Sequence, residues 1–339
     1  MSNFKKINPA SGAIIMAVGI FLYAAIEAFP FLNHVLGEVF TVLLTIIGII
    51  MYALLMCQFF HKSFLVPLLN NPVNSFLMGT WIAGVSVLCN VIHKYFPETI
   101  EIIQVIAFVN TLFWVLFIGV CVYNFKQLLK DPRSHLIHGV VLLSTVATQS
   151  IIIVWEELFP FVSSYFMIVS ISLGALFYVL GILLILIRYL RNTQWSLTED
   201  WTNTNCIIHG ALSITGLAIV TSNLLSPLVV LFIWLFVFTL LLIVEAIEIT
   251  RAIKRIKLLG WKKGVLTYHI SQWSRNFTFG MFYAFTMAMH EHSNYLSHFL
   301  NVFLTLWAWV VLIALIAEVG LLVEARYGFF ERKRLEKVV

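Results

Sequence analysis

Long apolar runs alternate with short polar segments along the whole chain. An α-helix needs roughly 20 apolar residues to cross the hydrocarbon core of a bilayer, and the runs have about this length or more. The pattern predicts ten membrane-spanning helices, at residues 9–29, 37–60, 72–92, 101–124, 135–155, 162–188, 205–225, 227–249, 272–290 and 297–325. We therefore expect an all-α membrane protein with a single transmembrane domain over residues 1–339.

The odd-numbered helices of this set begin with similar polar clusters, near positions 8, 71, 135, 204 and 273. These starts are 63 to 69 residues apart, which indicates five repeated helical hairpins, at about 8–60, 71–124, 135–188, 204–249 and 272–325. Five hairpins in one orientation can close as a pseudo-fivefold ring around a central pore. The odd helices are the expected inner set, because they hold most of the polar atoms that lipid would penalise.

The composition excludes a water-soluble enzyme. Hydrophobic residues make up 61% of the chain and charged residues only 11%, whereas a soluble domain is nearer half apolar and a quarter charged. The 4 cysteines are far apart and form no CxxC pair, so we expect neither a disulfide nor a metal framework. No cofactor, metal or nucleic-acid partner is predicted.

Basic residues lie almost entirely on one side of the predicted membrane topology. Lys94 alone lies in the opposite loops. The positive-inside rule therefore places both termini in the cytoplasm and predicts a multi-pass protein of the plasma membrane. The basic residues of the cytoplasmic side are Lys5, Lys6, Lys62, Lys126, Lys130, Arg133, Arg188, Arg191, Arg251, Lys254, Arg255, Lys257, Lys262, Lys263, Arg326, Arg332, Lys333, Arg334 and Lys337.

The expected pore is lined by hydroxyls, small residues and apolar side chains. Its ionisable residues are basic, namely Arg275, His138 and His209, and they lie towards the cytoplasmic end. An uncharged pore with basic groups at its mouth favours anions over cations.

Three local motifs lie at the start of odd-numbered helices. They are Asn8-Pro9-Ala10-Ser11-Gly12, Asn71-Pro72-Val73-Asn74-Ser75-Phe76 and Phe277-Thr278-Phe279-Gly280. With the hairpin count, they resemble the tellurite-resistance/dicarboxylate transporter family over the whole chain. That family includes the bacterial TehA channels, the plant slow-type anion channels and the fungal malate permeases and sulfite exporters.

The resemblance implies a homotrimer with one pore in each protomer. It also implies that the second phenylalanine of the third motif, Phe279, closes the pore. The other residues expected at the pore are Asn276, Thr278, Gly280, Asn74, Ser75, His138, His209, Ser213 and Gly12, with Arg275 as the charge at the cytoplasmic mouth. The expected partners are small inorganic or carboxylate anions and membrane lipid.

The chain departs from the family pattern in two places. Asn74 stands where the family commonly has arginine, which removes a fixed positive charge near the inner mouth. Ala13-Ile14-Ile15 stands where the first helix of the family usually has Phe-Gly, so the packing around the closing ring can differ.

Other readings of the sequence stay open. The main alternative function is a proton-coupled carrier for malate-like dicarboxylates or sulfite, with His138 or His209 as the protonatable group. The same two histidines are the pair best placed for haem in an electron carrier. His290, His292 and His298 form an outer cluster that we interpret as a solvated loop rather than a metal site. Glu248 is expected to pair with Arg251 three residues later, and Glu318, the deepest of the carboxylates in the last helices of the two final hairpins, has no explanation from the sequence.

Overall fold

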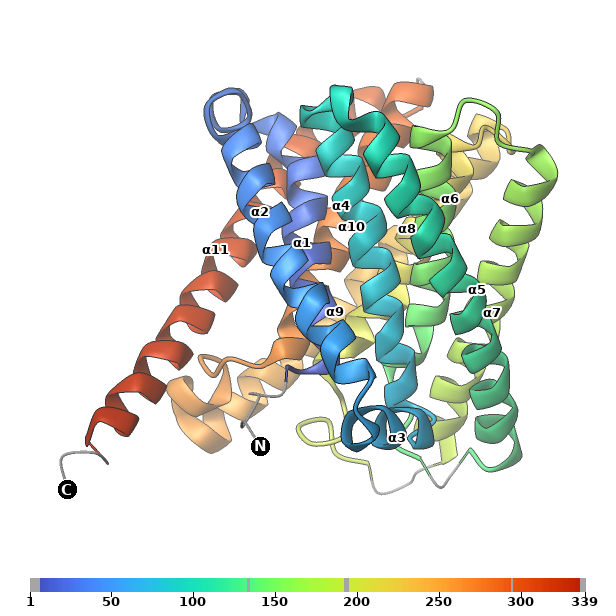
Figure 1. Ribbon diagram of the computed structural model, residues 1–339. Helices are drawn as coiled ribbons and strands as arrows, with labels where there is room; N and C mark the ends of the chain where they lie inside the picture. The colour runs from blue at the N-terminus through green and yellow to red at the C-terminus, as the bar shows by residue number, and fades with distance from the viewer. Residues whose placement is uncertain (1–6, 133–134, 192–194, 294, 336–339) are drawn as a thin grey trace.

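The computed structural model describes residues 7–132, 135–191, 195–293 and 295–335. This part of the chain holds eleven α-helices and no strand (Figure 1). Four basic residues of the predicted cytoplasmic side, Lys5, Lys6, Arg133 and Lys337, lie outside the described residues, as do the side chains of Arg332, Lys333 and Arg334.

Five helices are largely buried within the molecule. They are α1 (Gly12–Tyr23), α4 (Gly79–Tyr95), α6 (Leu143–Leu158), α8 (Ile207–Thr221) and α10 (Trp273–His292). In α4, α6 and α8, 72–89% of the most apolar window is buried. Each of the five contacts two others, in the closed order α1–α4–α6–α8–α10–α1. We call these five the inner helices.

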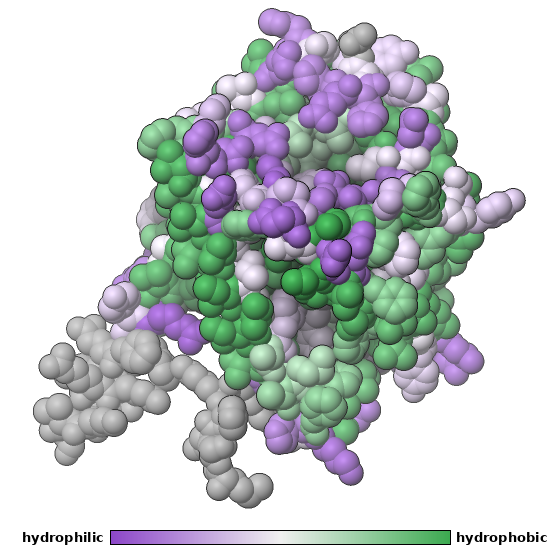
Figure 2. Space-filling view, turned by 45° about the horizontal axis from the view of Figure 1, so that its top comes forward, coloured by the Kyte–Doolittle hydropathy of each residue, from purple (hydrophilic) through white to green (hydrophobic). Residues whose placement is uncertain are grey.

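Five longer outer helices cover the inner ones. They are α2 (Pro30–Phe59), α5 (Ile100–Lys130), α7 (Ser164–Arg191), α9 (Pro227–Gly264) and α11 (Ser297–Leu335). Each contacts the inner helix that precedes it in the chain, and only 17–39% of its most apolar window is buried. Hydrophilic side chains gather on one end of the molecule and apolar side chains cover the flank below it (Figure 2). An apolar flank of this kind is what lipid contact requires.

Eight helices of the described chain are long and apolar enough to cross a membrane. Pro9–Tyr23 is a shorter apolar helix, and α10 is not among the eight. The all-α membrane class predicted from the sequence is therefore confirmed, and the ten-span count stays a prediction.

Several helix boundaries differ from the predicted ones. The first helix ends at Tyr23, where the chain changes to a 3-10 turn at Ala25–Ala28, and α2 begins at Pro30. The end of α9 extends to Gly264 across a kink at Gly260, whose φ is +75°. The short helix α3 (Lys62–Asn70) was not predicted, because its nine residues follow the apolar run of α2 without a long polar break.

A short 3-10 turn precedes each inner helix. These turns are η1 (Pro9–Ser11), η3 (Asn74–Met78), η5 (Gly139–Leu142), η6 (Asn203–Cys206) and η7 (Ile270–Gln272). They contact one another in the same cyclic order as the helices, so the N-terminal ends of all five inner helices meet at one end of the molecule. The first described segment, η1, and the C-terminal part of α11 lie at that end too (Figure 1).

Glycines allow the inner helices to approach closely. A β-carbon at Gly12 would lie 2.6 Å from the carbonyl oxygen of Thr80, and one at Gly79 would lie 2.7 Å from that of Leu143. Backbone atoms cannot swing aside as a side chain can, so these contacts require glycine. The five contacts of the ring are Gly12 with Thr80, Gly79 with Leu143, Gly139 with Thr204, Gly210 with Thr278 and Gly280 with Ile20.

We expect Gly79→Ala to destabilise the protein by about 1–3 kcal/mol, because the added methyl group overpacks the α4–α6 contact. Gly119→Ala is the matched control, since nothing lies within 4 Å of a β-carbon at Gly119 on the exposed face of α5. The measurement is the unfolding temperature of the purified protein in detergent. Equal unfolding temperatures for the two variants would contradict the close packing.

Candidate functional site

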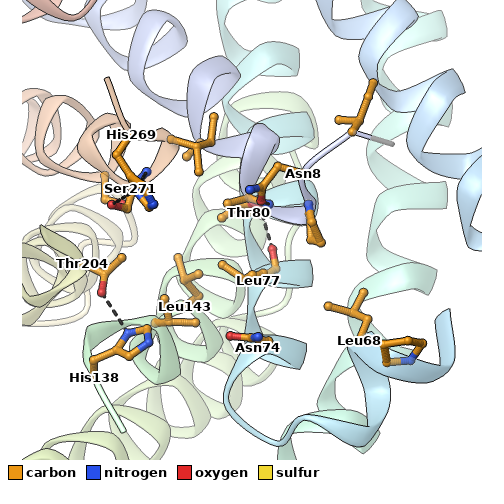
Figure 3. Close-up of a pocket in the computed structure, with 18 of the residues that line it drawn as sticks. Asn8, Leu68, Asn74, Leu77, Thr80, His138, Leu143, Thr204, His269 and Ser271 are labelled. Carbon is orange, nitrogen blue, oxygen red and sulfur yellow. Dashed lines mark hydrogen bonds between the residues drawn. The ribbon is translucent and has the colours of Figure 1, made fainter. Parts of the chain in front are cut away.

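A cavity of about 610 Å³ lies where the five turns meet. We call it the funnel. Each turn contributes to its wall, as do Phe64 and Leu68 of α3. Its residues come from elements far apart in the sequence and converge on one space (Figure 3). The lining residues from the turns include Pro9, Asn74, Val140, Thr204 and Ser271.

The polar groups of the funnel wall are amides, hydroxyls, two imidazoles and helix ends. Asn8 caps η1 by accepting a hydrogen bond from the Ala10 N–H at 2.9 Å, and His269 caps η7. The Nδ1 atom of His138 lies 2.9 Å from Oγ1 of Thr204. No aspartate or glutamate is among the described residues that line the funnel. Because N-terminal helix ends carry partial positive charge, five of them around one space attract an anion.

The axis narrows sharply beyond the funnel. Ala13, Thr80, Leu143 and Ser274 lie at its floor, on four different inner helices. A second cavity of only about 20 Å³ is lined by residues of all five inner helices, among them Ile20, Val87, Ser150, Ile214 and Met281. Four of these stand seven residues after a floor residue, which is two helical turns or about 10 Å further along. Packed side chains separate the two cavities.

The rotation of α10 decides which of its phenylalanines faces the axis. Ser274 lines the funnel and Met281 lines the small cavity, so these two mark the inward side of the helix. At about 100° per residue, Phe277 lies roughly 60° from Ser274 and Phe279 roughly 140° from it. Phe277 is 2% exposed and lies at a level between the two cavities.

The side chain of Phe279, by contrast, packs towards the outer helix α11. Its ring centroid lies 5.2 Å from that of Trp307 and 6.3 Å from that of His209. Nε1 of Trp307 donates a hydrogen bond to the Phe279 carbonyl oxygen at 3.1 Å. The residue predicted as the gate therefore borders neither cavity in this conformation.

Two of the other predicted pore residues line the funnel, Asn74 and His138. The rest line neither cavity. Gly12, Thr278 and Gly280 pack against neighbouring inner helices, and Ser213 donates a hydrogen bond to the His209 carbonyl oxygen at 2.9 Å. Ser75 accepts a hydrogen bond from Asn124 of α5 at 2.7 Å, and Asn276 is buried with its Oδ1 atom unpartnered.

Arg275, predicted at the cytoplasmic mouth, points instead to carboxylates of the outer helix α9. Its Nε lies 3.4 Å from Glu245 and its Nη2 lies 3.1 Å from Glu248. The predicted pair of Glu248 and Arg251 is confirmed, with 2.9 Å between Oε1 and Nη1. His209 is fully buried beside this group, with its Nε2 3.6 Å from Glu245. The positive charge of Arg275 is therefore largely cancelled by α9.

His138 lies just before the span Gly139–Leu158 and is neutral at physiological pH. Burial, followed by the positive charge of Arg188, lowers the pKa of the His138 imidazole to about 4. A histidine whose pKa is lowered gains its proton only below that value, so His138 is uncharged above about pH 5.

The funnel also contains residues that were not among the predicted pore residues. Asn8, Thr204 and Ser274 belong to the polar clusters that mark the starts of the inner helices, so that signal was present in the sequence. His269 and the residues of α3 carried no such signal, because they lie in connecting segments. Only the folded arrangement brings them to the funnel.

The chain was compared with models of known protein families. Residues 6–322 match the family model described as voltage-dependent anion channel. The chain belongs to the voltage-dependent anion channel family. The resemblance seen in the sequence motifs is thereby confirmed. No curated protein matches the chain in sequence. Members of this family are channels and transporters rather than enzymes, so the family supports an anion channel or transporter in general, acting on small anions in a membrane.

We expect a charge placed at Asn74 to change anion entry into the funnel. We expect Asn74→Lys to raise chloride flux at low ionic strength and Asn74→Asp to lower it, each by roughly threefold, which is the Coulomb effect of one charge at about 7 Å in water. The difference should vanish in about 1 M salt, where the screening length is about 3 Å. Chloride flux in liposomes measures the effect, and Gln127→Glu, near the same end on α5, is the control. A difference in flux that does not change with salt concentration would exclude an electrostatic cause.

Proposed function

We propose that this protein conducts small anions across the plasma membrane along the axis enclosed by its inner helices. Membership of the voltage-dependent anion channel family carries the proposal. The funnel supports it, because five helix N-termini and no carboxylate of the described chain face one cavity on that axis. The anion reaches the narrow part of the axis from this electrostatically favourable space.

The funnel end is proposed to face the cytoplasm. The C-terminal ends of the outer helices lie at that end and carry basic residues such as Lys130, Arg191 and Lys262, which favour the cytoplasmic side of a membrane. Both termini are then cytoplasmic. The homotrimer implied by the sequence resemblance remains part of the proposal, with one pathway in each protomer.

We assign closure of the pathway to the stretch of packed side chains between the two cavities. An anion cannot cross such a stretch without losing its hydration shell, and this loss is costly where no charge replaces the water. Each of the other four inner helices carries an alanine at this level, namely Ala17, Ala83, Ala147 and Ala211. Phe277 is the large ring among them, and so we assign the closing role to Phe277 in this conformation.

We expect Phe277→Ala to raise the anion conductance by roughly tenfold or more, since it removes a large ring from the level at which the other inner helices carry alanines. Phe279→Ala should leave the closed pathway intact and lower stability, because its ring packs against Trp307. The measurement is current in oocytes or planar bilayers, in chloride, nitrate and malate. Phe236→Ala, on the exposed face of α9, controls for loss of an aromatic ring.

The same recordings separate the alternatives. A current raised by Phe279→Ala alone would return the gating role to Phe279. Silence in every variant, with uptake of malate or sulfite that follows a proton gradient, would replace the channel by the proton-coupled carrier.

His138 tests one form of that carrier. We expect His138→Gln to leave the pH profile of flux unchanged between about pH 5.5 and pH 8, because the pKa of His138, at about 4, keeps the imidazole neutral over that range. Flux is measured at equal pH on both sides of a liposome. A pH profile that flattens in this variant would mark His138 as a transported-proton site.

A further inference from the structure

A buried group of charged residues lies behind the inner helices, away from both cavities. It joins His209 of α8, Glu245, Glu248 and Arg251 of α9 and Arg275 of α10, and it includes Glu318 of α11, on which the charge of Arg275 acts. We call it the charge cluster. It holds three carboxylates, two guanidinium groups and one imidazole. None of these six residues lines the funnel or the small cavity.

The charge cluster is electrically neutral only when it holds one extra proton. Three ionised carboxylates outweigh two guanidinium groups by one charge, and an unbalanced charge inside a membrane protein is expensive. Glu248 already contacts both arginines, Arg251 at 2.9 Å and Arg275 at 3.1 Å. Glu318 is 5% exposed and its Oε1 has no hydrogen-bond partner. The proton therefore has two places to reside, Glu318 and the pair of His209 and Glu245.

His209 is built to receive that proton. Its side chain is fully buried, and neither ring nitrogen has a hydrogen-bond partner. Nε2 faces Oε1 of Glu245 at 3.6 Å, just beyond hydrogen-bond distance and within reach of an ion pair. A neutral imidazole can donate to this oxygen only as the tautomer with its proton on Nε2, whereas an imidazolium always carries that proton and adds a positive charge facing the carboxylate. Glu245 keeps 17% of its side-chain surface exposed, which gives a proton access.

The other titratable groups around His209 do not compete for this role. Arg275 of α10 faces the other carboxylate oxygen of Glu245, Oε2, at 3.4 Å, and Glu248 is already paired. Cys206, at the start of α8, is fully buried. Tyr178 of α7 is occupied in donating a hydrogen bond to the Ile208 carbonyl oxygen at 3.1 Å.

The ring of His209 also contacts the segment of α10 that closes the axis. It lies 6.3 Å from the Phe279 ring at an interplanar angle of 27°, and Phe279 is two residues after Phe277. A proton on His209 converts this neutral stack into a cation–π contact and draws the ring towards Glu245. Both changes act on the packing of α10.

We propose that His209 and Glu245 form a proton-binding site behind the pathway, and that a proton bound there changes the rate of anion flux. The inference rests on the proposed function for its flux readout. It concerns regulation of the pathway from a site that the anion does not visit.

The test is chloride flux through the full-length protein in liposomes, at equal pH inside and outside, from about pH 5 to pH 8. We expect flux of the unmodified protein to change by roughly tenfold over this range. His209→Gln should reduce the change to within about twofold. Glu245→Gln should shift the midpoint of the profile to lower pH, because it removes the carboxylate that favours the imidazolium. His61→Gln, an exposed histidine before α3, is the matched control and should behave as the unmodified protein.

A pH-independent flux of the unmodified protein, or an unchanged profile in His209→Gln, would overturn the proposal. A second measurement stands apart from transport, namely the unfolding temperature of the purified proteins over the same pH range. If His209 binds a proton, the unfolding temperature of the unmodified protein depends on pH. His61→Gln should show the same pH dependence, and His209→Gln should lose it. If no variant passes anions, the proposed function fails, and the unfolding data alone still decide whether the proton site exists. If His209→Gln does not fold, Glu245→Gln, which keeps the shape of the side chain, decides the question.

Discussion

Close contact between the five inner helices is the constraint on which the rest of the structure depends. Lipid tails are as apolar as leucine, so no hydrophobic effect pulls two apolar helices together inside a membrane. What remains is van der Waals contact at short range and hydrogen bonding between helices. A glycine at each contact of the ring supplies the first, as at Gly79 against the Leu143 backbone. Replacing any one of these glycines would separate two neighbouring helices. Because the helices form a closed ring, the change would affect the whole ring.

Hydrogen bonding between helices comes largely from the outer helices. Asn110 of α5 donates to Ser86 of α4 at 3.0 Å, and Trp234 of α9 donates to Thr286 of α10 at 2.8 Å. Trp307 of α11 donates to the Phe279 backbone in the same way. Each bond joins a polar group on the buried side of an outer helix to a polar group of the inner layer. The sequence analysis assigned the hydroxyls of the inner helices to the pore. Some of them instead form hydrogen bonds that join the inner and outer helices.

The sequence predicted the layers better than the rotation of each helix. Lipid penalises polar atoms wherever they stand on a helix, so composition alone separated inner from outer helices, and the pair of Glu248 and Arg251 followed from a spacing of three residues. Rotation depends on contacts between distant segments. Thr278 meets Gly210 of α8 and Gly280 meets Ile20 of α1, and these two contacts turn Phe279 away from the axis. Arg275 likewise finds its partners on α9, which no local pattern indicates.

The pairing of Arg275 with Glu245 and Glu248 weakens anion binding at the mouth of the proposed pathway. A free guanidinium at the mouth would bind an anion tightly, and tight binding slows release. With that charge cancelled by Glu245 and Glu248, the attraction of anions in the proposed pathway comes from helix ends and neutral side chains such as Asn8 and Asn74. These are partial charges spread over a space of about 610 Å³. Attraction of this kind raises the local concentration of many small anions without holding one of them, so discrimination among them falls to the narrow stretch, where each must give up its water.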